Sequence, residues 1–190
     1  MSNGKTILND FVEHWKNKFK PKKAGKKSGL SDAWSNYLRN LLEKKFGCVI
    51  YECAFPLAVT KDINPKHRLD AAVWSKKDQP VSPMDIAIEW QWDFGKADKF
   101  VKGDFLKVLY APAKAGLAIV STRSAQKSSL EKAEKFIKKM KKKYANGKRG
   151  YSVGVIEVRK IRAGGGKKKY QCYFYDFLSD KEEALQKLTW

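Results

Sequence analysis

The order of hydrophobic patterns along the chain predicts an α/β sandwich with a central mixed β-sheet. Three strand-like segments follow one another with no helix between them, which is typical of an antiparallel meander. A helical segment separates the third strand from the fourth, as a parallel crossover requires. A chain of 190 residues, 43% of them hydrophobic, is long enough for one full core. We therefore expect a single domain over residues 30–190, preceded by an N-terminal helix and basic linker in residues 1–29.

The N-terminal part predicts two helices joined by a linker. Apolar residues at helical spacing indicate the first helix, which ends before Pro21. Residues 21–29 are rich in Lys and Gly, so this linker is either simply solvated or also in contact with phosphate. Ser31 as an N-cap and Gly47 after the last turn bound the second helix.

The central part predicts the meander and the crossover. Apolar, β-branched and aromatic residues indicate its strands, which are 48–55, 69–74 and 84–92. The polar segment 75–83 predicts a hairpin loop. A helix is expected over 96–110, and the continuous apolar run 116–121 is typical of a buried strand.

The C-terminal part predicts a basic helix, a strand pair and a short closing helix. The helix covers residues 128–144, and its outer face is almost entirely lysine. The predicted strands are 151–161 and 170–177, joined by a Gly- and Lys-rich turn. Ser179 with Glu182 indicates the N-cap of the closing helix.

The charge balance points to a polyanionic partner. Forty Lys and Arg residues against twenty Asp and Glu give a net charge of +20, so nucleic acid is the leading partner. No apolar run approaches the roughly 18 residues that a spanning helix needs, and no signal peptide is recognisable, so we expect a cytoplasmic protein with no membrane partner. Three cysteines without a Cys-x-x-Cys pair, beside two histidines, predict neither a disulfide framework nor a zinc site.

Acidic side chains within two apolar strands are the main chemical signal. Asp70 lies early in one strand, and Glu89 and Gln91 lie late in the next, where the period of two puts both on one face. We expect the hairpin to bring Asp70 beside them. Two carboxylates suit Mg²⁺, which takes oxygen ligands. The alternative to a metal site is that neighbouring lysines neutralise both carboxylates. A third acid, Asp85, lies four residues before Glu89 and is expected at the surface.

Two short segments resemble a known motif. Leu-Asp-Ala-Ala-Val at 69–73 and Ile-Ala-Ile-Glu-Trp-Gln at 86–91 are similar to the two halves of the PD-(D/E)XK nuclease motif, in a Glu-x-Gln variant. The resemblance implies a restriction-endonuclease-like α/β/α sandwich with a central mixed β-sheet. Its element order matches residues 31–121, about half of the chain.

The resemblance also implies residue roles. Asp70 and Glu89 are the expected ligands of Mg²⁺, or alternatively Mn²⁺, with the backbone carbonyl of Trp90 as a further ligand. Gln91 occupies the position that usually holds a lysine. Glutamine hydrogen-bonds but brings no positive charge to the phosphate, so this position departs from the pattern of the family.

Other residues are expected to complete the site. Lys107, on the following helix, is the candidate for the missing positive charge, with Lys96 as second choice and a solvated lysine as the alternative. An acidic residue on the preceding helix often joins such sites in this family, which points to Glu43, with Glu52 on the first strand as a rival.

The resulting expectation is a Mg²⁺-dependent endonuclease that hydrolyses phosphodiester bonds in double-stranded DNA, of the restriction, phage or repair type. A homodimer is compatible with this function, because one site cuts one strand. The first alternative is a non-catalytic basic DNA- or RNA-binding protein on the same fold, in which Gln91 marks lost chemistry. The second is a ribosome-associated basic protein without this fold.

Overall fold

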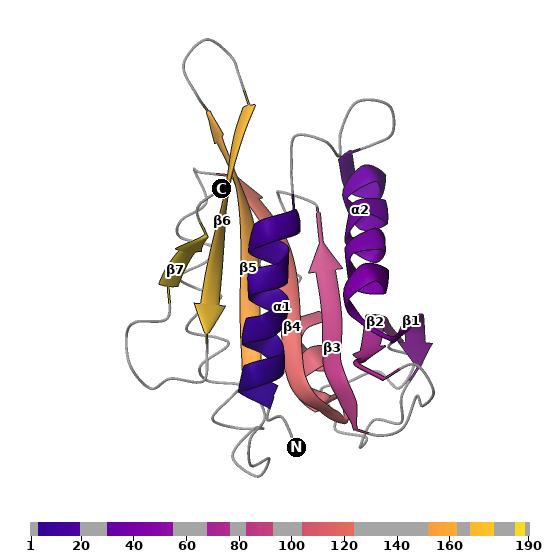
Figure 1. The fold of residues 1–190 in the computed structure, drawn as a ribbon. Helices are drawn as coiled ribbons and strands as arrows, with labels where there is room; N and C mark the ends of the chain where they lie inside the picture. The colour runs from indigo at the N-terminus through magenta and orange to yellow at the C-terminus, as the bar shows by residue number, and fades with distance from the viewer. Residues whose placement is uncertain are drawn as a thin grey trace.

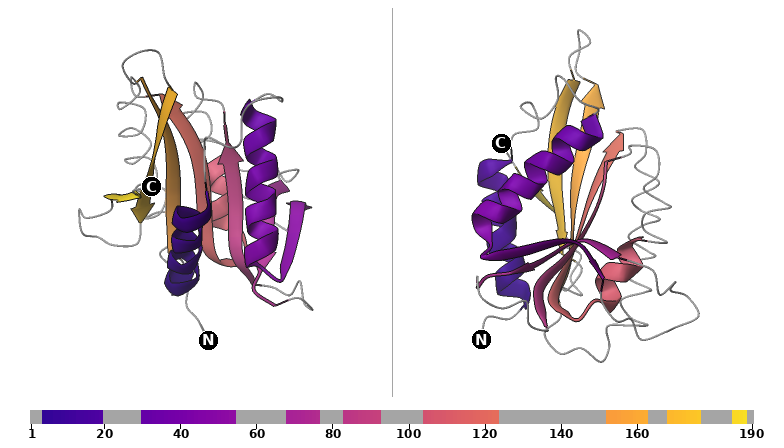
Figure 2. Two further views of the ribbon diagram at one scale, coloured as in Figure 1. Left: turned by 45° about the horizontal axis from the view of Figure 1, so that its top comes forward. Right: turned by 90° about the vertical axis from the view of Figure 1, so that its right-hand side faces the viewer.

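A seven-stranded mixed β-sheet with helices on both faces is the framework of the protein (Figures 1 and 2). The computed structural model describes residues 4–19, 30–54, 68–76, 83–92, 104–123, 152–162, 168–176 and 185–188. The described helices are α1 (Gly4–Lys18), α2 (Leu30–Lys45) and α4 (Asp104–Tyr110). The strands are β1 (Cys48–Ala54), β2 (Arg68–Trp74), β3 (Met84–Gln91), β4 (Ala113–Arg123), β5 (Ser152–Arg162), β6 (Lys168–Asp176) and β7 (Leu185–Leu188).

The strands lie in the sheet in the order in which they occur along the chain. Strands β1, β2 and β3 form an antiparallel meander. Strand β4 then pairs parallel to β3, and β5 parallel to β4, before β6 and β7 return antiparallel. The predicted meander and parallel crossover are therefore confirmed, and the mixed α/β architecture is compatible with the predicted sandwich.

Helices α1 and α2 cover one face of the sheet with an aromatic core (Figure 2). Phe11 and Trp15 of α1 and Phe19, directly after it, recur every four residues, so they lie on one side, and all three are buried. The rings of Trp15 and Phe19 stack with centroids 4.0 Å apart, and Trp34 from α2 packs against Phe19 in a T-shaped arrangement. Helix α1, which the sequence analysis set apart within residues 1–29, therefore shares the core of the 30–190 domain.

Helix α4 covers part of the opposite face (Figure 2). Small and apolar side chains of β2 and β3 pack there against Val108 and Ala111. Because side chains alternate along a strand, Ala87 and Glu89 of β3 point to this face, whereas Ile86 and Ile88 point to the aromatic core. Glu89, one of the two expected metal ligands, is therefore on the α4 face.

Two local predictions are wrong. Asp85 is buried rather than exposed, because it accepts hydrogen bonds from the Ser75 amide at 2.7 Å and from Lys114 Nζ at 2.6 Å. Residues Leu185–Leu188 form a strand on β6 rather than part of a closing helix, since pairing with an open strand edge outweighs a local helical preference.

Several predictions fall on residues that the structure does not describe. These are the linker 21–29, Lys96 and the residues of the 96–110 helix before Asp104, the basic helix 128–144, and the capping residues Ser179 and Glu182.

Candidate active site

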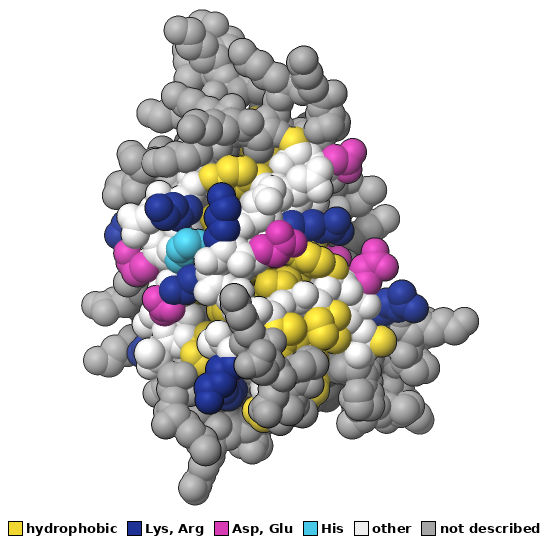
Figure 3. All heavy atoms as spheres, turned by 45° about the vertical axis from the view of Figure 1, so that its right-hand side comes forward, with side chains coloured by type: hydrophobic (Ala, Val, Ile, Leu, Met, Phe, Trp, Pro, Cys, Tyr) yellow, Lys and Arg dark blue, Asp and Glu magenta, His cyan; other side chains and the backbone are white. Residues whose placement is uncertain are grey.

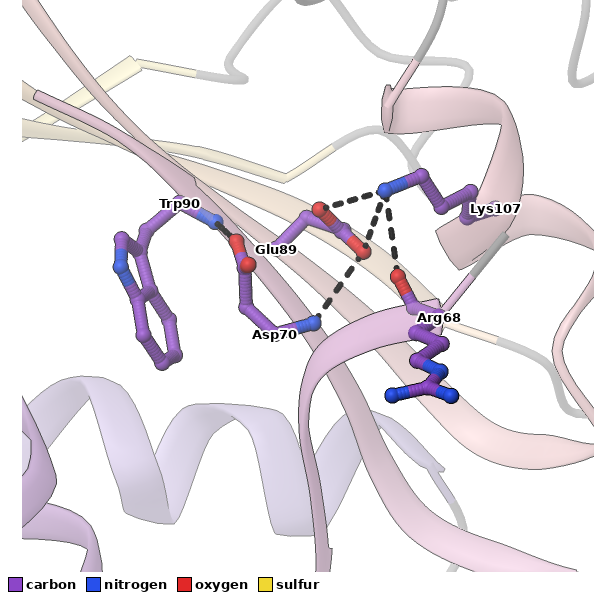
Figure 4. A network of polar contacts seen from close by, with 5 residues as sticks. All are labelled: Arg68, Asp70, Glu89, Trp90 and Lys107. Atoms are coloured by element: carbon purple, nitrogen blue, oxygen red, sulfur yellow. Dashed lines mark hydrogen bonds and ion pairs between the residues drawn. The ribbon is translucent and has the colours of Figure 1, made fainter. Parts of the chain in front are cut away.

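Asp70 and Glu89 meet where β2 and β3 separate (Figure 4). The antiparallel register pairs Ala71 with Ile88, so its continuation places Asp70 opposite Glu89. The Asp70 amide donates to Glu89 Oε1 at 3.2 Å, and Asp70 Oδ2 accepts from the Trp90 amide at 2.7 Å. The expected proximity of the two acids is confirmed, and each is held by the backbone of the other strand.

Lys107 joins this pair from α4 (Figure 4). Its Nζ lies 3.2 and 3.3 Å from Glu89 Oε1 and Oε2, and it donates to the Arg68 carbonyl at 3.1 Å. The side chains of Glu89 and Lys107 are only 2% and 10% exposed. Burial of both charges is tolerable because each neutralises the other. The solvated-lysine alternative for Lys107 is therefore wrong.

The backbone is irregular at Asp70. In a regular strand Leu69 and Ala71 share a face, but Leu69 packs with the α4-side cluster and Ala71 with the aromatic core. Glu52 lies opposite Asp70 in the β1–β2 register, between the paired residues Tyr51 and Cys53. Its φ of 49° is in the left-handed region, which a non-glycine residue adopts only at a cost. Tyr51 and Cys53 of β1 likewise pack on opposite faces, so the alternation of side chains is interrupted in both strands at the level of Asp70.

The Trp90 backbone faces β2. In an extended strand the N–H and C=O of one residue point to the same side, and those of the next residue to the other. The Trp90 amide binds Asp70 of β2, whereas the Gln91 carbonyl accepts from Ser121 Oγ of β4 at 3.3 Å. The Trp90 carbonyl, the further ligand implied by the resemblance, is consequently on the side of Asp70. Half-buried Gln91 follows Glu89 on the α4 face by alternation.

The structure does not bring Glu43 into this network. Glu43 accepts the Tyr51 hydroxyl at 3.0 Å, and Tyr51 packs against the aromatic core, on the other face of the sheet from Lys107. Burial, with a smaller contribution from Glu43, raises the pKa of Tyr51. The rival Glu52 is exposed, and its carboxylate lies 3.8 Å from Arg68 Nη1. The Arg68 carbonyl accepts from Lys107, so Glu52 pairs with a residue of the network in Figure 4.

Another buried acid, Glu157, carried no sequence prediction. Glu157 lies in the apolar strand β5, a pattern like that of Glu89, and its side chain is 0% exposed. Arg159, two residues later on the same face, binds both its oxygens at 2.9 Å and stacks over Tyr173. An acidic residue within an apolar strand is therefore not specific to a metal site, because Glu157 shows the same pattern and pairs with an arginine of its own strand.

The donor set at Asp70 and Glu89 consists of oxygen atoms only. Among the residues that the structure describes, no group of three or more His, Cys, Asp and Glu side chains is arranged to hold a metal ion. Among the described residues, the two carboxylates and nearby main-chain carbonyls are thus candidate ligands here. This set matches Mg²⁺, which usually takes one or two carboxylates and keeps several waters.

The described surface carries charges of both signs. On the face in Figure 3, Lys and Arg side chains are interspersed with Asp and Glu. The lysine-rich segments 21–29 and 128–144 lie outside the described residues. None of the helices that the structure describes combines the length and apolar character needed to traverse a bilayer.

Comparison with protein-family models, with curated protein sequences and with solved structures finds no match for this chain. Its function is therefore inferred from the site.

Proposed function

We propose that this protein is a metal-dependent endonuclease with a restriction-endonuclease-like fold that hydrolyses phosphodiester bonds in double-stranded DNA. One observation carries the proposal: Glu89 of β3 accepts hydrogen bonds from the Asp70 amide of β2 and from Lys107 Nζ of α4, and the Asp70 carboxylate binds the next amide of β3, that of Trp90. Two acids that can hold a metal ion, beside a positively charged side chain, are groups that metal-dependent phosphodiester hydrolysis uses. The net charge of +20 supports a nucleic-acid substrate.

The carboxylates of Asp70 and Glu89 would hold Mg²⁺ or Mn²⁺, and the Trp90 carbonyl would add a third oxygen. Such a cation polarises the scissile phosphate and lowers the pKa of a bound water. Lys107 contributes the positive charge that Gln91 lacks, close to where negative charge develops on the phosphate. The Gln91 amide orients the phosphate or the attacking water by hydrogen bonding.

A second candidate is a non-catalytic nucleic-acid-binding protein on the same fold. Lys107 contacts both oxygens of Glu89 and so neutralises this buried carboxylate. A non-catalytic protein on the same fold would need the same neutralisation, because no metal ion would balance the charge. The two candidates differ in metal dependence. Binding without catalysis needs only phosphate contacts and weakens steeply with salt.

The deciding experiment incubates supercoiled plasmid and, separately, RNA with the protein, with and without Mg²⁺. Asp70→Ala and Glu89→Ala are expected to lower the cleavage rate by at least about 100-fold, because each removes a metal ligand. Glu13→Ala is the matched control, since Glu13 is an exposed acid on α1. Nicked product indicates one cut per encounter, and linear product indicates paired sites.

Cleavage that survives both Asp70→Ala and Glu89→Ala would remove the assigned site. Tight, salt-sensitive binding without metal-dependent nicking would favour the second candidate. Cleavage of RNA but not of plasmid would contradict the proposed DNA substrate, but not the assignment of the catalytic residues.

A further inference from the structure

The Lys107 ammonium lies against oxygen atoms of the kind that bind metal cations. An ammonium group has three hydrogens to donate, and Lys107 Nζ lies 3.1 to 3.3 Å from three oxygen atoms. Two of these oxygens belong to Glu89 and the third is the Arg68 carbonyl. Carboxylate and carbonyl oxygens are also the ligands that a divalent cation takes. The same acceptors therefore suit either cation.

Both cations cannot use Glu89 fully at the same time. Mg²⁺ binds oxygen at about 2.0 to 2.1 Å, which would place it within a few ångströms of the ammonium group. The Glu89 side chain is 2% exposed, so little water screens the repulsion between two cations there. Oε1 is further engaged by the Asp70 amide. Loading the site therefore requires Lys107 to give up part of its contact with Glu89.

We infer that Lys107 is an internal counter-ion that competes with the divalent cation for Glu89 and is displaced when the cation binds. This inference rests on the proposed function, because it concerns the same site. Lys107 also donates to the Arg68 carbonyl, which is a neutral acceptor. The lysine stem is flexible and anchored on α4, so the released ammonium stays near the site and can bind phosphate.

The competition is measured by titrating the full chain with Mn²⁺ in a calorimeter. Lys107→Met is expected to lower the apparent Kd for Mn²⁺ by about tenfold or more, because the variant no longer spends most of its time with Glu89 occupied. Lys107→Gln, which keeps a hydrogen-bond donor without the charge, is expected to act in the same direction. It serves where the Met variant does not fold, as judged by circular dichroism.

Two controls confine the effect to this site. Lys114→Met removes the same charge from another lysine–acid pair, with Asp85 near the opposite end of β3, and is expected to leave the Kd unchanged. Glu89→Gln is expected to abolish the binding, since it removes the shared ligand. The thermal midpoint of Lys107→Met in EDTA is expected to lie below that of the parent and to rise more on adding Mn²⁺.

The outcomes separate this inference from the proposed function. Glu89-dependent Mn²⁺ binding that is equal or weaker in both Lys107 variants overturns the competition and leaves the nuclease proposal standing. An absence of Glu89-dependent Mn²⁺ binding in the parent and in both variants overturns the metal site itself. Tighter binding in the variants supports the competition even where the plasmid assay detects no cleavage.

Discussion

The buried ion pair between Lys107 and Glu89 is expected to show strong energetic coupling. The perturbation is a double-mutant cycle of Lys107→Met and Glu89→Leu, measured in EDTA. Each single change leaves a charge in a place where the partner side chains are 10% and 2% exposed, which costs about 3 to 5 kcal/mol. The double variant leaves neither charge behind, but it loses the hydrogen bonds that Glu89 and Lys107 make to the Asp70 amide and the Arg68 carbonyl, so it keeps a cost of its own. We expect that cost to be about 2 to 3 kcal/mol less than the sum of the two single costs, which is the coupling energy.

An exposed ion pair supplies the matched comparison. Lys45 Nζ lies 2.6 Å from Asp10, closer than the 3.2 Å between Lys107 and Glu89, but the Asp10 side chain is 64% exposed. Exposed pairs couple by about 0.2 to 1 kcal/mol, because water screens the attraction. Burial and distance therefore predict opposite rankings of the two pairs.

The assay is urea denaturation followed by far-ultraviolet circular dichroism, with free energies of unfolding obtained by linear extrapolation. A coupling energy for Lys107 and Glu89 no larger than that for Lys45 and Asp10 would refute the reasoning. It would mean that Glu89 finds another partner, or water, as soon as Lys107 is removed.

Three further results are expected. Lys107→Ala is expected to lower the rate of plasmid cleavage by about 100-fold. Adding Gln91→Lys to this variant is expected to restore part of the rate, because the new lysine supplies the missing positive charge. A double variant no faster than Lys107→Ala would show that a lysine at position 91 cannot replace Lys107. Burial opposes ionisation of Asp85, but hydrogen bonds from Lys114 and the Ser75 amide hold its pKa below the usual value. The stabilisation from Asp85 is therefore present above its unfolded pKa of about 3.9 and is lost as the pH falls through the lower folded value, so Asp85→Asn is expected to flatten acid unfolding followed by circular dichroism; an equally steep curve would contradict this. Gly154→Ala places a Cβ 2.6 Å from the Phe174 ring and is expected to lower the free energy of unfolding by about 1 to 3 kcal/mol in urea, whereas an unchanged midpoint would show that the ring moves aside.

Local patterns were enough to predict the central fold. The meander strands and the crossover carry alternating or continuous apolar residues, and these depend on neighbours in sequence. The meeting of Asp70 with Glu89 was also predictable, because antiparallel strands joined by a short connection have few registers that bury their apolar faces.

Local pattern failed where a distant partner decides the environment. The acids Glu89, Asp85 and Glu157 all lie in apolar strands, but they bind Lys107 of α4, Lys114 of β4 and Arg159 of β5. Arg159 lies two residues from Glu157, but Lys107 and Lys114 are far in sequence from the acids that they bind. The sequence around Glu89 and Asp85 therefore does not show which basic residue each will pair with.

The sequence by itself determined strands β1 to β6, the charge and the two acids of the candidate site, because these follow from residue type and short-range periodicity. Only the tertiary structure decided that Lys107 closes over Glu89, that Glu43 turns to Tyr51, and that residues 185–188 extend the sheet. These three outcomes depend on how helices and strands pack. The ion-pair partner of a buried charge is the opposite charge that helix and strand packing places next to it. In the same way, the segment that pairs with an open strand edge is the one that the fold places beside it.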